Sequence, residues 1–170
     1  MPNYGYGSWS AARFERLSLV RAAIVVTVAV FLVGCSAGKP PPTPVTLGSR
    51  AGAIIWFEAN GFTGKESPLA DGTPRWLANG PLNSLGEVQG PGDTVTSLSL
   101  VAPITSDSAQ LTGVFLNEFA PGSRDFLSTV LAATQTSGAQ DQSERIGGHI
   151  VRVQTADVGS GTYEVSLTIS

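Results

Sequence analysis

A short apolar run near the start of the chain divides its 170 residues into two parts. Residues 22–33 are twelve consecutive positions without a charge, and the segment before them carries three arginines, ending with Arg21, against one acid. A positively charged flank followed by a short apolar core is typical of a secretory signal. Because a helix needs about 20 apolar residues to span a bilayer, this run is too short for a transmembrane helix. We therefore expect residues 1–34 to be a leader that is cleaved off.

The run ends in Leu32-Val33-Gly34-Cys35, which contains the only cysteine of the chain. This tetrapeptide resembles the lipobox of bacterial lipoproteins, in which aliphatic and small residues precede an invariant cysteine. The resemblance implies that the chain is cut between Gly34 and Cys35 and that the Cys35 thiol carries a diacylglyceryl group. Since two or more acyl chains give lasting attachment, we expect the mature protein to be bound to a bacterial envelope membrane, on its extracytoplasmic face. The alternative is an ordinary signal peptide or membrane anchor with an unrelated cysteine.

Residues 35–48 follow the leader and contain four prolines within five positions, from Pro40 to Pro44. Proline-dense segments extend by about 3.1 Å per residue and behave as semi-rigid spacers. We expect this tether to hold the following domain on the order of 30 Å from the lipid.

The charge balance of residues 35–170 limits the partners of the mature protein. Twelve acids stand against seven bases in this part of the chain. This balance argues against a nucleic-acid partner, which would require a basic patch. With Cys35 lipidated, no thiol remains for a disulfide or a metal. Residues 49–170 suffice for a single domain with one hydrophobic core.

Hydrophobic periodicity predicts an α+β fold for this domain. Residues 49–60 are expected to form a helix capped by Ser49 and stopped at Asn60-Gly61, with a short buried strand as the alternative. Residues 140–144 are expected to be a polar loop. The other expected elements are strands over 75–78, 82–89 and 94–104, helices capped at Ser106 or Asp107 and at Ser123, and strands over 149–155 and 162–170.

The expected order is therefore helix, three strands, two helices, two strands. The last strand alternates most clearly, with Tyr163, Val165, Leu167 and Ile169 on one face. A strand with one apolar face belongs to a sheet that is covered on one side. We expect a two-layer domain in which an antiparallel sheet of about five strands carries the helices on one face.

No motif for catalysis or metal binding is visible. The only histidine, His149, stands at an expected strand start, where a structural role is expected. The chain has no Gly-x-Ser-x-Gly elbow and no cluster of metal ligands at the usual spacing. Residues 67–75 and 90–93 are similar to parts of small uncharacterised bacterial domains, a resemblance that implies no activity. We expect no cofactor, no metal and no catalysis.

Four residues are the candidates for a binding surface. Trp56, Phe62 and Trp76 flank a loop-rich stretch, and aromatic side chains are enriched where proteins contact partners. The alternative is that all three aromatic side chains belong to the core. Arg75 is expected to pair with a nearby acid or, alternatively, to meet an anionic partner.

Together these features predict a membrane-anchored lipoprotein whose domain is a non-catalytic binding or accessory module for an envelope protein or an apolar ligand. One alternative is a carrier that encloses an apolar ligand such as a lipid, in a cavity lined by the sheet face and the helices. A second alternative is a hydrolase in which two carboxylates face each other in a cleft, one with a raised pKa.

Overall fold

The computed structural model describes residues 47–159 and 161–170 of the chain. The expected leader, the cleavage and lipidation site at Gly34 and Cys35, and nearly all of the tether lie outside the described residues. The same is true of Ser160 in the last expected turn.

The described residues form three α-helices and seven strands, which confirms the α+β class and corrects the expected five strands. Four strands lie between the first helix and the helix pair, and three follow it. In chain order the elements are α2 (Arg50–Ala59), β1 (Thr63–Glu66), β2 (Arg75–Asn79), the short 3-10 turn η1 (Pro81–Asn83), β3 (Leu85–Gln89), β4 (Ser97–Pro103), α3 (Ser106–Phe119), α4 (Arg124–Ser137), β5 (Asp141–Ile146), β6 (His149–Gly159) and β7 (Thr162–Ile169).

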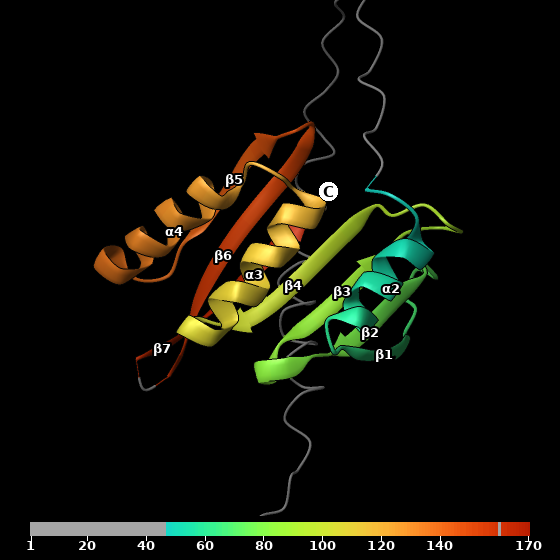
Figure 1. Cartoon of the computed structure of the whole chain (residues 1–170), viewed down its shortest axis with the longest axis horizontal. Helices are drawn as coiled ribbons and strands as arrows, with labels where there is room; N and C mark the ends of the chain where they lie inside the picture. Colours follow the sequence, from blue (N-terminus) through green and yellow to red (C-terminus); the bar gives the residue numbers. More distant parts are fainter. Residues whose placement is uncertain (1–46, 160) are drawn as a thin grey trace, which may run out of the picture. The chain divides into compact units, whose positions relative to one another are not determined.

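All seven strands belong to one sheet, in the order β1-β2-β3-β4-β7-β6-β5, and every neighbouring pair is antiparallel. The two halves of the chain meet where β4 pairs with β7, with Leu100 opposite Leu167. Figure 1 shows α2 over the β1–β3 half and α3 and α4 over the other half, all on one face of the sheet.

The two strands that the sequence did not predict are the outer ones, β1 and β5. All four residues of β1 are exposed, and β5, which replaces the expected polar loop, has no buried residue. Polar and charged side chains are usual on edge strands, because they discourage pairing with other chains. Such strands carry no hydrophobic alternation, so only their backbone pairing with β2 and β6 defines them.

Helix α2 begins and ends as expected, and the alternative of a strand over these residues is wrong. The Ser49 hydroxyl accepts a hydrogen bond from the Gly52 amide at 3.0 Å, which is a regular N-cap. At the other end Asn60 donates from its side chain to the Trp56 carbonyl at 2.8 Å. Arg50 forms an ion pair of 2.7 Å with Glu66 and so ties the helix to the edge strand β1.

Helix α3 begins at Ser106, and its N-cap is Thr105, one residue before the first of the two expected caps, Ser106 and Asp107. The Thr105 hydroxyl accepts from the Ser108 amide, and the Ser108 hydroxyl accepts from the Thr105 amide. This reciprocal arrangement is a capping box, with Ser108 in the position that Glu or Gln usually takes. Ser123 precedes α4 as expected, although its buried hydroxyl donates to the Ala120 carbonyl rather than capping the helix. Among the described helices none is long and apolar enough to cross a membrane.

The hydrophobic core lies between the helices and the sheet face that they cover. Phe57 of α2, Phe115 of α3 and Val130 of α4 are fully buried against strand residues such as Leu100 and Leu167. Beneath Phe57 the sheet carries Gly86, where an added Cβ would lie 2.7 Å from the Phe57 ring. The core extends to Leu47, which the sequence analysis places in the tether and which is 7% exposed.

Candidate functional site

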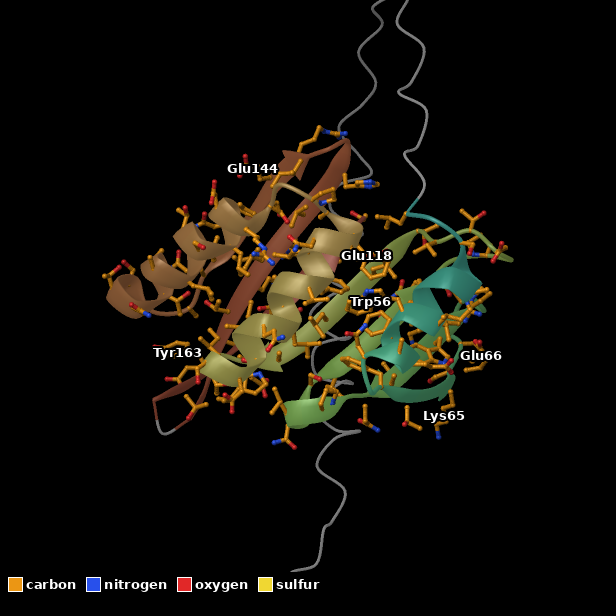
Figure 2. All side chains as sticks on the ribbon, in the orientation of Figure 1. Trp56, Lys65, Glu66, Glu118, Glu144 and Tyr163 are labelled. Carbon is orange, nitrogen blue, oxygen red and sulfur yellow. The ribbon has the colours of Figure 1, made fainter. Side chains whose placement is uncertain are left out.

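A half-open cleft of about 400 Å3 lies between the first two turns of α2 and the C-terminal end of α3. Its apolar lining comes from both helices and from the segments beside them. Among the described lining residues, those with a polar or charged side chain are Ser49, Glu118 and His149. Figure 2 labels Trp56 on α2 and Glu118 near the end of α3, in the region where the two helices approach each other. The apolar residues are Leu47, Ala53, Trp56, Phe119 and Pro121.

Trp56 is the largest side chain of the cleft and joins the two helices that form it. Its ring makes edge-on contacts with Phe119 at a centroid distance of 5.1 Å, with Phe57 at 5.2 Å and with Phe115 at 5.8 Å. Aromatic rings favour such edge-to-face packing, and three contacts of this kind fix the orientation of the indole. Because Trp56 is only half-buried, part of the ring forms the wall of the cleft. The cleft therefore presents a rigid aromatic surface.

Glu118 is the only acidic residue among the described residues that line the cleft. Its side chain is exposed, and no hydrogen bond or ion pair links it to another of the described residues. Glu118 stands in the last turn of α3, which has no basic residue. A carboxylate is unfavourable there, because the C-terminal end of a helix carries a partial negative charge.

His149 enters the cleft from the sheet, as the first residue of β6, where it pairs with Ile146. The imidazole is half-buried, and its Nδ1 atom is shielded from solvent without a hydrogen-bond partner in the described structure. The expected strand-start position of His149 is confirmed. Its place beside the cleft adds a polar ring to the wall that Ser49 and Glu118 also line.

The structure brings one of the four candidate binding residues to the cleft, namely Trp56. Phe62 and Trp76 are 3% and 4% exposed and belong to the core, as the alternative interpretation held. Arg75 bonds to Ser67, with Nε donating to the carbonyl at 2.8 Å and Nη2 to the hydroxyl at 3.1 Å, so its partner is a neutral residue rather than an acid. The four residues therefore do not form one surface.

The cleft also contains residues that the sequence analysis did not single out, above all Glu118, Phe119 and Ser49. Of these, Ser49 was expected only to cap its helix. The local signal for Glu118 was an acid at the negative end of a helix, a position that helix electrostatics disfavour. Breaks of a local rule of this kind are often found at functional sites.

Besides the pair of Arg50 and Glu66, a further ion pair lies outside the cleft, on the last strands of the sheet. Arg152 of β6 donates to both carboxylate oxygens of Asp141 on β5, at 2.8 and 2.5 Å. This pairing holds the pKa of Asp141 below its usual value and raises that of Arg152. Among the described residues no group of three or more His, Cys, Asp and Glu is placed to hold a metal ion.

No protein-family model matches this chain, and neither a curated protein nor a solved structure matches it.

Proposed function

We propose that the domain is a non-catalytic binding module that takes the apolar body of a small ligand into the cleft between α2 and α3. The cleft itself carries this proposal. Its volume of about 400 Å3 lies within the range of small-molecule sites, and its wall combines apolar side chains with polar surface in nearly equal parts. Trp56 and Phe119 supply flat aromatic surface for contact.

We further propose that lipid on Cys35 holds this module at a bacterial envelope membrane, on the extracytoplasmic face. Support comes from the charged flank, the short apolar run and the sequence Leu32-Val33-Gly34-Cys35. In this arrangement the proline-dense segment keeps the cleft clear of the membrane surface, where it can meet ligands or an envelope protein.

The position of the cleft favours a binding module over the two alternatives. A carrier that encloses its ligand would be expected to use the covered face of the sheet, yet that face packs against Phe57, Phe115 and Val130. Of the described residues that line this half-open cleft, His149 alone belongs to a strand. A carboxylate hydrolase would require a second acid opposite Glu118, and the described lining contains none.

The proposal predicts that filling the cleft abolishes ligand binding without unfolding the domain. Gly52 lies on the cleft wall within α2, and an added Cβ meets the Ser49 hydroxyl at 3.0 Å, a side-chain atom that can rotate away at the cost of the N-cap hydrogen bond. Gly52→Leu therefore inserts an apolar side chain at the opening, and it improves the helix propensity of the position. Thermal melting by circular dichroism checks that the variant is folded.

Binding is measured by fluorine NMR of the full, lipidated chain in phosphatidylcholine nanodiscs, after labelling with fluorotryptophan. Residues 35–170 contain two tryptophans, Trp56 in the cleft and Trp76 in the core. Three probes of one shape are titrated: phenethylammonium, phenethyl alcohol and hydrocinnamate. We expect at least one probe to shift the Trp56 signal and not the Trp76 signal, and Gly52→Leu to remove the shift.

Gly113→Leu is the matched control, because it makes the same exchange within a helix but away from the cleft. There the added Cβ meets the flexible Arg124 side chain, at 3.3 Å. The control variant should bind like the unmodified protein. If no probe shifts Trp56, or if Gly52→Leu leaves the shift intact, the cleft is not the binding site and the proposal is wrong.

A further inference from the structure

We infer that the ligand of this cleft is a small organic cation, in which an apolar body is joined to a positively charged nitrogen. The inference rests on the proposed function and adds the charge of the ligand to it. Four features of the described residues carry it: the unpaired Glu118 carboxylate, the end of α3, the state of the α2 N-terminus and the ring of Trp56.

The first feature is the carboxylate of Glu118. Glu118 lines the cleft, and no hydrogen bond or ion pair links it to a described residue. The described lining also contains no lysine or arginine. A carboxylate next to an apolar wall is a complementary partner for an ammonium group, and charge-assisted hydrogen bonds are about twice as strong as neutral ones. An anionic ligand at the same place would be repelled.

The second feature is the C-terminal end of α3, which reaches the cleft at Glu118 and Phe119. The aligned peptide dipoles place about half a negative charge at this end of a helix. The last turn contains no basic residue that would offset it. The helix end and the carboxylate therefore act in the same direction, and both favour a cation.

The third feature concerns α2, whose N-terminus also borders the cleft and would on its own favour an anion. The backbone amides of its first turn, which no helix carbonyl can accept from, already face acceptors within the protein. The Arg50 amide donates to the Asp93 carbonyl at 2.9 Å, the Gly52 amide donates to the Ser49 hydroxyl at 3.0 Å, and the Ala51 amide lies 3.4 Å from a carboxylate oxygen of Asp93. The negative charge of Asp93 further offsets the positive end of this helix. No backbone amide of this first turn is left for an anion.

The fourth feature is the indole of Trp56. Tryptophan is the strongest aromatic partner for a cation, which is attracted to the face of the ring. The contacts with Phe57, Phe115 and Phe119 hold the indole in place, so little ordering cost remains when a ligand binds. The net negative charge of residues 35–170 adds a long-range attraction for cations.

The three phenethyl probes test the inference in the nanodisc assay, because they share an apolar body and differ in charge. We expect phenethylammonium to bind about tenfold more tightly than phenethyl alcohol, with hydrocinnamate the weakest. Glu118→Gln should bring the affinity of phenethylammonium close to that of the alcohol and leave the alcohol unchanged. Empty nanodiscs give the blank for partition of the probes into lipid.

Asp107→Asn is the matched control for charge. Asp107 is an exposed acid in the first turn of the same helix, about 16 Å along the axis from Glu118. Asp107→Asn changes the net charge by the same amount as Glu118→Gln, but this control variant should preserve the preference for phenethylammonium. If Asp107→Asn weakens that preference as much as Glu118→Gln, the overall field rather than the cleft selects the ligand, and the inference is overturned.

The remaining outcomes separate this inference from the proposed function. Equal binding of all three probes, abolished by Gly52→Leu, would leave the binding module intact and overturn the preference for a cation. A preference for phenethylammonium that survives Glu118→Gln would also overturn the inference. Absence of any Trp56 shift would overturn both.

Discussion

At the scale of single residues, Phe57 is the centre of the structure around the cleft. Its ring contacts five aromatic neighbours at centroid distances from 5.0 to 6.5 Å, and it is fully buried. It joins α2 to the sheet below and to α3 beside it. The neighbours are Trp56, Phe62, Trp76, Phe115 and Phe119.

We predict that Phe57→Ala lowers the free energy of unfolding by about 3–5 kcal/mol, the range for truncation of a buried phenylalanine. Lost apolar burial and the cavity that remains both contribute. Chemical denaturation followed by circular dichroism gives the value. The control is Ile55→Ala on the same helix, where the side chain is 63% exposed and the expected change is within about 0.5 kcal/mol. Similar values for the two variants would contradict the assigned orientation of α2.

Trp56 and Trp76 show that residue type alone does not tell whether an aromatic side chain lies in the core or at a binding surface. Both were candidates for a binding surface, yet Trp76 is 4% exposed on a strand beneath Phe57, whereas Trp56 is half-buried at the edge of α2. The difference depends on which elements pack against each face. That is a property of the tertiary arrangement, and neither local sequence contains it.

At the scale of elements, the outer strands β1 and β5 have the fewest buried contacts of the sheet, because neither has a buried residue. Strand β5 has no buried residue, and the pairing of Asp141 with Arg152 of β6 adds a side-chain tie to the backbone ladder. The side chain of Gln154 also donates to Asp141, at 3.1 Å. These contacts make Asp141 the natural position at which to test the edge.

We predict that Asp141→Asn destabilises the domain near neutral pH, by at most about 1 kcal/mol because the pair is largely exposed. The hydrogen bonds from Arg152 lower the pKa of Asp141 in the folded state below its ordinary value of 3.8. A lowered pKa means that the ionised carboxylate stabilises the fold at pH values above 3.8, and that this contribution is lost as the pH falls through the folded-state value. Denaturation midpoints of both proteins across the acid range measure it.

The difference between the two proteins should therefore be largest near neutral pH and should vanish in strong acid. A difference that stayed constant with pH would mean that the carboxylate is not stabilised by Arg152. Asp125→Asn is a suitable control, since Asp125 is exposed on α4 and no side-chain partner of its carboxylate is found among the described residues.

Helices and strands with a periodic pattern of apolar residues could be predicted from the sequence. The strands that are defined only by backbone pairing with a neighbouring strand could not. The three helices and the strands β2, β3, β4, β6 and β7 all overlap expected elements, because each contributes buried apolar side chains to the core. The helix pair differed only in the position of one cap. The strands β1 and β5 bury nothing, so periodicity gave no signal for them.

At the scale of the whole molecule, the two-layer arrangement followed from the one-sided pattern of the last strand, and Figure 1 shows it directly. The chain folds as two successive sets, each with helices before strands, that join at β4 and β7. The cleft lies where the first set's helix meets the end of α3. It could not be predicted from the sequence, because its walls come from residues about 100 positions apart, from Ser49 to His149.

The proposed tether of this domain to a membrane is tested most directly by the intact mass of the membrane-extracted protein. We predict a mature chain that begins at Cys35 and carries the added mass of acyl chains. In Cys35→Ala the acyl mass should be absent and the protein should no longer be processed at this site. A full-length chain without lipid would contradict the tether and would leave the cleft without its proposed place at the envelope.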